Sequence, residues 1–400
     1  MTQATPPTAP EKSAGQVIAI LSAANFMIGM GAFMVIGMLI PVAEDLSITA
    51  ASAGWLLTAY AIGYAVLSPV LVSLTGAIGR RRVLSAGLLI FALSNLAAAL
   101  SPNEVFLFAT RVVAAAGAGL ITPIGAAVAA ALSPPDRQAR ALSGVFIGLT
   151  LSQVFGVPAG GFIAYTFGWR AAFLVVFLLC VPVLYLMWTR VPQGLKFQPV
   201  TLANLGKMLL DVPILLAVSF TMLFVASSYV ILTYLGPLLF ATMGFEREGI
   251  TTYLLVSGLG AVVGNLIAGR VTDRIGPFYT LLTLCGVQMC VLPAFSALPI
   301  PVPTLFVLGF TWSAFGWSFN AAQQARLIHL APQSASVVLA LNAAALYVGT
   351  ALGSAVGGVV LLGYGLNALG IGGGIGIFLA ALVLVISDRV NRGIAVSSHL

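Results

Sequence analysis

The sequence predicts an all-α membrane protein in which twelve transmembrane helices form two pseudo-symmetric six-helix bundles. Three observations lead to this fold: the composition, the spacing of the charged residues and an internal repeat. Hydrophobic residues make up 60% of the 400 residues and charged residues only 7%, whereas a soluble domain carries about 25% charge. This composition excludes a soluble enzyme, a disordered chain and a disulfide scaffold, and it leaves a polytopic membrane protein.

Charged residues divide the chain into uncharged runs that can be counted as membrane helices. A membrane helix needs about 20 residues. Two runs, 275–325 and 327–387, are long enough for two helices each, with breaks at Pro299, Pro301 and Pro303 and near Gly363-Tyr364-Gly365. The strand-length alternation of a membrane barrel is absent. Eight further runs hold one helix each: 13–43, 46–79, 83–103, 112–135, 141–169, 171–189, 212–245 and 249–269.

The basic residues predict how these helices are oriented. With both termini inside, 14 Lys and Arg residues fall in cytoplasmic segments, only Arg170 and Arg247 fall in outside loops, and Arg111 lies within a span. This bias predicts a multi-pass protein of the bacterial inner membrane with both termini in the cytoplasm. The polar N-terminus does not resemble a cleaved signal peptide. The cytoplasmic set is Lys12, Arg80, Arg81, Arg82, Arg137, Arg140, Arg190, Lys196, Lys207, Arg270, Arg274, Arg326, Arg389 and Arg392.

An internal repeat divides the chain into two halves. The sequence Thr-Gly-Ala-Ile-Gly at 75–79 corresponds to Thr-Asp-Arg-Ile-Gly at 272–276, the Leu-Ser-Pro at 132–134 to the Leu-Ala-Pro at 330–332, and Gly160-Gly161 to Gly357-Gly358. Nearly equal offsets at equivalent places indicate a duplication, which is a transporter architecture with the substrate site between the halves. The expected organisation is a tail at 1–14, bundles at 15–189 and 211–388, a linker at 190–210 and a tail at 389–400.

These segments resemble the major facilitator superfamily over nearly the whole chain. The resemblance lies in Gly54 to Tyr60 and Gly79 to Arg82, in Arg111 with Gly117 and Gly119, in Gly156-Val157-Pro158-Ala159-Gly160-Gly161, in Gly168 to Phe173 and in Gln324 to Gly358. Within the superfamily the chain is similar to the bacterial twelve-span branch that exports drugs, sugars and purines. The resemblance implies the major facilitator fold and proton-coupled efflux by alternating access. It also implies that the Gly79–Arg82 loop stabilises one conformation.

Three positions depart from the pattern of that branch. The first span often carries a Glu-Phe pair whose carboxylate couples transport to protons, and here the pair is Ala32-Phe33. Gly76 replaces an acid of the loop after the second span, although its counterpart Asp273 is present in the second half, and Tyr347 replaces an Asn in the eleventh span. All ten acids lie in loops or at helix ends, so the group that would carry the proton is not evident.

Arg111 is the one charge well inside a span. A buried arginine must face the bundle interior and find acceptors. It is expected either to bond to helix-end carbonyls or Glu104 as a structural residue, or to contact the substrate or a switching element.

Further residues are candidates for substrate binding or for conformational change. The binding or coupling candidates share a polar or aromatic side chain expected to face inward, although helix–helix hydrogen bonding and an interfacial belt explain such residues as well: Asn25, Tyr60, Gln153, Tyr229, Tyr234, Trp312, Asn320, Gln323, Asn342 and Tyr347. The conformational candidates are loop residues and small residues that permit close packing or kinking: Gly79, Arg80, Arg81, Gly156, Pro158, Gly160, Gly161, Asp273, Arg274, Gly276, Gly353 and Gly357.

The sequence therefore predicts a monomeric secondary transporter that moves a small organic molecule outward in exchange for protons. One alternative is a facilitator or exchanger of a small anion that uses Arg111 as counter-charge, and another is a sensor on the same fold that does not transport. No ATP-binding loop, catalytic constellation, cofactor site, metal site or nucleic-acid partner is expected.

Overall fold

The computed structural model of the chain describes residues 11–134, 138–194, 206, 210–331 and 335–397. Every regular element within these ranges is a helix. Twelve of the helical stretches are long and apolar enough to cross a membrane. The predicted all-α fold with twelve spans is thereby confirmed.

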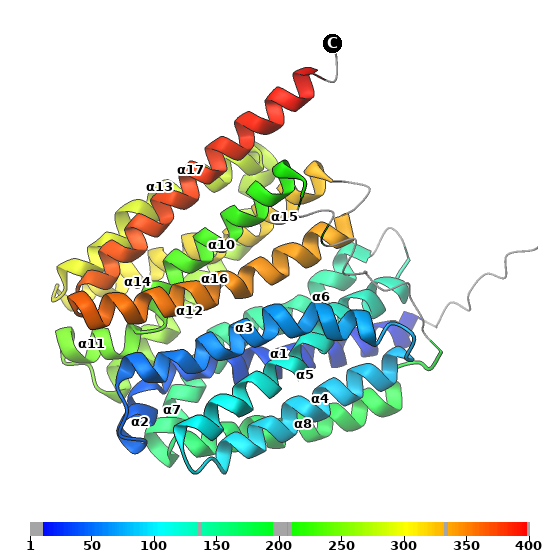
Figure 1. Cartoon of the computed structure of the whole chain (residues 1–400), viewed down its shortest axis with the longest axis horizontal. Coiled ribbons are helices and arrows are strands. Elements are labelled where there is room, and N and C mark those ends of the chain that lie inside the picture. The colour runs from blue at the N-terminus through cyan, green and yellow to red at the C-terminus, as the bar shows by residue number, and fades with distance from the viewer. Residues whose placement is uncertain (1–10, 135–137, 195–205, 207–209, 332–334, 398–400) are drawn as a thin grey trace, which may run out of the picture.

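The first half of the chain forms the lower bundle in Figure 1. Its fifth span contains a π-helical stretch, η2 (Ser152–Gly156), which ends two residues before Pro158. Proline has no amide hydrogen for the helix ladder, so this π-turn lies where the regular hydrogen-bond pattern is interrupted. The helices of this bundle are α1 (Glu11–Gly37), α2 (Leu39–Asp45), α3 (Ala50–Leu74), α4 (Arg80–Ala99), α5 (Glu104–Ala131), α6 (Gln138–Leu151), α7 (Val157–Phe167) and α8 (Trp169–Arg190).

The second half forms the upper bundle. The breaks that the sequence predicts in its two long uncharged runs are present: Pro299 and Pro301 separate the ninth and tenth spans, and Gly365, at φ 83°, separates the last two. The helices are α10 (Val212–Leu232), α11 (Leu235–Met243), α12 (Arg247–Ile275), α13 (Pro277–Ala294) with the 3₁₀ turn η3 (Phe295–Ala297), α14 (Val302–Trp317), α15 (Phe319–Leu330), α16 (Ala335–Tyr364) and α17 (Ala368–Ser397).

The short helices α2 and α11 show the repeat in three dimensions. Each follows the first span of its half, and each has a proline as its third residue, Pro41 and Pro237. They lie at the same end of the molecule (Figure 1), which we call the α2–α11 end. We call the opposite end, where α4 begins at Arg80 and α8 ends at Arg190, the basic end.

Two expected boundaries differ in the structure. The segment 389–400, predicted to be a tail, is helical through Ser397, because α17 continues without a proline and gains an ion pair between Asp388 and Arg392 at 2.8 Å. The α1 helix begins at Glu11, within the predicted tail 1–14. Most of the expected linker at 190–210 lies outside the described residues.

An ion pair and two hydrogen bonds connect the loops of the first half at the α2–α11 end. Arg170, at the start of α8, forms an ion pair with Asp45 at the end of α2 and donates a hydrogen bond to the Ser101 carbonyl at 3.1 Å. The indole of Trp169 donates to the same Asp45 carboxylate at 3.0 Å. The ends of three spans are therefore held together by one carboxylate and its two donors.

Candidate substrate cavity

The two halves are joined at the α2–α11 end. The Ser354 hydroxyl of α16 donates to the Gly54 carbonyl of α3 at 3.0 Å, and the Tyr234 hydroxyl donates to the Ser354 carbonyl at 2.9 Å. The ring of Tyr234 packs so closely on Gly54 that no side chain would fit there. A second helix pair is in contact at this end, where the Arg247 guanidinium of α12 lies 4.7 Å from the centre of the Phe162 ring of α7. These contacts close one end of the interface between the halves.

The contacts between the two halves differ along the interface towards the basic end. At mid-height the Tyr64 ring of α3 stacks on the Tyr347 ring of α16, with centroids 3.7 Å apart. Beyond this stack the ribbons of α3 and α16 diverge (Figure 1). The contacts between the halves are thus concentrated in the middle and at the α2–α11 end.

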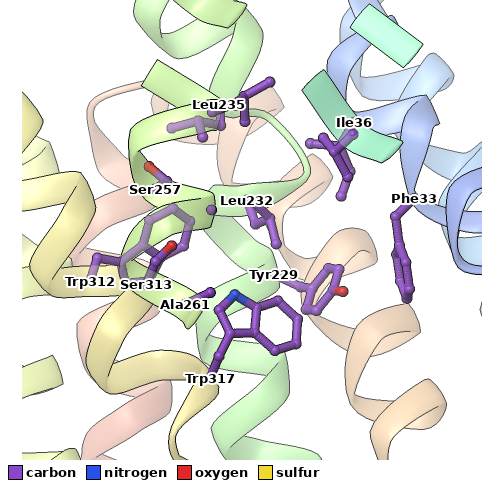
Figure 2. A pocket seen from close by; sticks show the side chains of 13 residues that line it. Phe33, Ile36, Tyr229, Leu232, Leu235, Ser257, Ala261, Trp312, Ser313 and Trp317 are labelled. Atoms are coloured by element: carbon purple, nitrogen blue, oxygen red, sulfur yellow. The ribbon is translucent and has the colours of Figure 1, made fainter. Parts of the chain in front are cut away.

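A small cavity lies between the halves on the wall of the second bundle. Figure 2 shows Tyr229 of α10 and the two tryptophans of α14 around this space, with Phe33 of α1 across from them. Its free volume is about 40 Å³, which is room for about three water molecules. Its lining consists of Phe33, Ile36, Val157, Tyr229, Leu232, Leu235, Leu254, Ser257, Gly258, Ala261, Trp312, Ser313 and Trp317.

A second space of about 20 Å³ shares part of this wall. It extends the aromatic surface to Phe224 and Phe319 and adds the hydroxyl of Ser228. Because both spaces are bordered by Tyr229, Leu232, Trp312, Ser313 and Trp317, we treat them together as the aromatic cavity. Among the predicted candidates, Tyr229 and Trp312 line it.

Arg111 is buried but does not line the aromatic cavity. One guanidinium nitrogen donates to the carbonyls of Gly31 at 2.8 Å and Ala32 at 3.4 Å on α1, and the guanidinium lies 4.7 Å from the Tyr60 ring and 5.6 Å from the Phe173 ring. Its Nε has no partner in the described part of the chain. The acceptors are therefore mid-helix carbonyls of a neighbouring span and two π-faces, in place of the helix-end carbonyls or Glu104 that the sequence suggested.

The candidates with buried amide side chains belong to two equivalent polar clusters, one inside each half. In the first, the Asn25 amide donates to the carbonyls of Leu21 and Val145, and its oxygen accepts from Thr122 at 2.7 Å. In the second, Thr221 donates to the Asn342 oxygen at 2.6 Å, while Gln323 donates to Thr221 at 2.9 Å and to the Ala217 carbonyl at 2.7 Å. Each cluster joins the first, fourth and fifth spans of its half. Hydrogen bonding between helices thus accounts for Asn25, Asn342 and one side of Gln323.

Three other candidates are placed as follows. Tyr60 is buried with its ring against Arg111 and 6.5 Å from the Tyr347 ring. Asn320 is half-buried and lines neither space of the aromatic cavity. Gln153 lies in the π-turn η2, and its side chain is outside what the structure describes.

Comparison with known proteins agrees with this architecture. The sequence profile of the Major Facilitator Superfamily matches residues 21–354. The chain belongs to the Major Facilitator Superfamily. It is 33% identical over 367 residues to the MFS-type transporter YtbD of Bacillus subtilis, covering 90% of this chain and 92% of that protein. It is 31% identical over 374 residues to a protein of Streptomyces lividans named chloramphenicol resistance protein, covering 92% of this chain and 94% of that protein.

A solved superfamily structure gives the same overall fold. A bacterial homologue of the human lysosomal transporter Spinster, in an inward-facing and unoccupied conformation, aligns with a TM-score of 0.70 at 17% identity, over 96% of this chain and 98% of that one. Together with the bacterial relatives, the twelve apolar helices make this chain a multi-pass membrane protein of the bacterial inner membrane.

In the first half, the loop after the second span, Gly79 to Arg82, makes several contacts with its surroundings. Arg80 is buried and donates to the Thr75 carbonyl at 3.5 Å. Arg81 lies 4.9 Å from the Trp188 ring and donates to Gln193, beyond the end of α8. Gly79, which precedes α4, has open space where a side chain would lie.

The equivalent loop of the second half is looser. Asp273 and Arg274 are exposed, and neither forms an ion pair with any described residue. Gly276 ends α12 at φ 82°, a conformation that favours glycine. That the two loops differ in how they stabilise a conformation, as Gly76 and Asp273 suggest, stays a prediction.

The glycine-rich faces of the superfamily's fifth and eleventh spans pack inside their own halves. Gly156, Gly160 and Gly161, beside Pro158, lie against Met30, Met34 and Gly37 of α1. Gly353 and Gly357 lie against Ala226 and Val230 of α10. These contacts are tight seams within each bundle, and a shift of the helices at these glycines during transport stays a prediction.

Sequence reasoning missed most of the cavity wall. Phe33, Trp317, Ser257, Ser313, Ser228 and Phe224 were not among the candidates. In an apolar span, an aromatic side chain facing a cavity looks the same in the sequence as one facing lipid. One pattern in the sequence could have indicated this wall: two tryptophans and two serines lie within the seven residues from Trp312 to Ser318.

Proposed function

We propose that the protein is a secondary transporter that moves a small organic molecule outward across the inner membrane by alternating access. The observation that carries this proposal is the aromatic cavity, which lies between the two halves and is lined by both, while contacts between the halves close the interface at the α2–α11 end. Such a site can be exposed to either side of the membrane when the halves rock. One relative, from Pasteurella multocida, is named a probable sugar efflux transporter, and another, from Streptomyces lividans, is named a chloramphenicol resistance protein. These names support the outward direction.

The test is a ligand screen followed by an exchange assay. Chloramphenicol, sugars and a panel of charged and uncharged metabolites are screened for a rise in the melting temperature of the purified protein, because a ligand of the native state stabilises it. Compounds that stabilise the wild type but not Trp317→Ala are then assayed for exchange in proteoliposomes. Exchange above the level of protein-free liposomes is expected. Stabilisation through the cavity without exchange would instead favour the sensor.

The orientation is part of the same proposal. The bias of basic residues supports an orientation with the basic end and both termini in the cytoplasm. A cysteine introduced as Lys196→Cys is expected to react with an impermeant maleimide only in inside-out vesicles. Labelling of intact cells at this position would contradict the orientation.

A second candidate is facilitated exchange without protons. It is favoured by Ala32, which stands where the related exporters often have a carboxylate, and by the absence of Asp or Glu from the middle of every described span. An imposed pH gradient that drives accumulation against a concentration gradient would support antiport. Equal exchange with and without the gradient would support the facilitator. The anion-exchange alternative requires Arg111 to face the substrate, and its guanidinium is instead engaged with α1, Tyr60 and Phe173.

A further inference from the structure

The walls of the aromatic cavity restrict the chemistry of what can bind there. Trp312 and Trp317 on α14, Tyr229 on α10 and Phe33 on α1 present their rings around one space (Figure 2). Phe224 and Phe319 continue this surface. Flat aromatic walls favour stacking or edge-to-face contact with another ring, which adds to the gain from burial of apolar area.

No charged side chain lines the cavity. None of the lining residues is Asp, Glu, Lys, Arg or His. The three buried arginines among the described residues are engaged elsewhere: Arg80 with the Thr75 carbonyl, Arg111 with α1, and Arg326 with the Ser387 hydroxyl at 2.7 Å. An anion would therefore enter without a counter-charge. A cation would meet only ring faces, whose attraction is weaker than the cost of removing a charge from water.

The cavity does offer hydroxyl groups. Ser257 lines the cavity, and its buried Oγ interacts with the Tyr253 hydroxyl. Ser313 lies on the same wall (Figure 2), and Ser228 borders the adjoining space. Because a serine hydroxyl both donates and accepts hydrogen bonds, these serines can bond to a hydroxyl, amide or sulfonamide group of a ligand.

We infer that the aromatic cavity binds an uncharged aromatic compound that carries hydrogen-bonding groups, and that it rejects the charged analogues of that compound. The inference rests on the proposed transport function and names the substrate class for the same site. The present free volume of about 40 Å³ is too small for such a molecule. Because most of the rings belong to the second half while Phe33, Ile36 and Val157 belong to the first, separation of the halves would widen the space without removing the aromatic wall.

The test uses three fluorescent probes that share one aromatic group and differ in charge: dansylamide is neutral, dansylglycine is an anion and dansyl-ethylenediamine is a cation at pH 7. Binding to the purified protein is followed by energy transfer from tryptophan to the dansyl group, with protein-free micelles as background. Dansylamide is expected to bind at least tenfold more tightly than either charged probe.

Three variants localise the binding, and equilibrium dialysis measures it independently of tryptophan emission. Trp317→Ala and Ser257→Ala are expected to weaken dansylamide binding at least fivefold, whereas Trp317→Phe retains an aromatic wall and most of the affinity. Trp55→Ala is the matched control, because this tryptophan is exposed on α3 away from the cavity, and it is expected to leave the affinity unchanged.

Equal or tighter binding of a charged probe, or dansylamide binding that neither Trp317→Ala nor Ser257→Ala weakens, would overturn the inference. Its failure is distinguishable from failure of the transport proposal. Exchange of a charged compound by a protein that does not bind dansylamide would overturn the inference and leave the transporter intact. Selective binding of dansylamide by a protein that exchanges none of its ligands would support the inference and contradict transport.

Discussion

At the scale of single residues, the first bundle accommodates the buried charge of Arg111. Its guanidinium has no carboxylate partner among the described residues and is held by the Gly31 and Ala32 carbonyls and by two rings. The sequence predicted that the side chain faces the bundle interior. It could not predict the acceptors, because backbone carbonyls of another helix leave no trace in residue identity.

Replacement of Arg111 is therefore expected to destabilise the first bundle. Arg111→Ala leaves a hole beside Tyr60 and removes a charged hydrogen bond, which lowers the free energy of unfolding by about 2–3 kcal/mol. Arg111→Lys retains the charge but not the planar fork, so a smaller loss is expected. The melting temperature in detergent measures both. Glu104→Gln is the control and should not change it; a large loss with that variant would restore Glu104 as the partner.

Asp45 provides a prediction on pH. Hydrogen bonds from Arg170 and Trp169 lower the pKa of this carboxyl below its ordinary value. A lowered pKa stabilises the fold above the ordinary carboxyl pKa near 4, and this stabilisation is lost as the pH falls through the lowered pKa. Because the pair is partly exposed, its contribution is about 0.5 kcal/mol.

Asp45→Asn should accordingly lower the melting temperature at pH 7 and much less at pH 3, and added salt should narrow the difference at pH 7. If Asp45→Asn lowers the melting temperature by the same amount at both pH values, the carboxylate charge of Asp45 does not contribute to stability.

At the scale of helices, the glycine seams connect sequence to packing. A Cβ at Gly353 would overlap the Ala226 carbonyl of α10, and one at Gly160 would overlap the Met34 side chain of α1. Gly286 on α13 has open space at the same position.

We expect Gly353→Ala and Gly160→Ala to destabilise the protein by about 1–3 kcal/mol through overpacking, with Gly160→Leu and Gly357→Leu worse. Gly286→Ala should be neutral or slightly stabilising, because alanine favours helix. Thermal unfolding of the three alanine variants checks this. If Gly353→Ala and Gly160→Ala unfold like wild type yet transport nothing, these seams belong to the moving parts after all.

Most of the helical architecture could be predicted from the sequence, and the cavity could not. Charge gaps and the prolines at Pro299 and Pro301 place span ends well, because charges and unbonded amides are excluded from lipid. The face that a span turns towards the cavity depends on packing between helices far apart in the chain. Gly353 illustrates this limit: its small size was evident, but its partner Ala226 was not.

At the scale of the whole molecule, transport by alternating access requires the two halves to separate at the α2–α11 end. The structure shows that end closed by the Ser354–Gly54 hydrogen bond, by Tyr234 and by the contact of Arg247 with Phe162. If the protein works by alternating access, these contacts must break in every cycle, and a covalent bridge across them must stop transport.

The most direct test is therefore to bridge the halves at that end. Phe162→Cys and Arg247→Cys are combined with Cys290→Ser, which removes the exposed native thiol while Cys180 and Cys285 stay buried. The pair is joined by a short bifunctional methanethiosulfonate, and exchange of a compound selected by the ligand screen is measured in proteoliposomes. The account predicts that bridging abolishes exchange, that a reductant restores it, and that each single cysteine treated alike remains active. Undiminished exchange by fully bridged protein would contradict it.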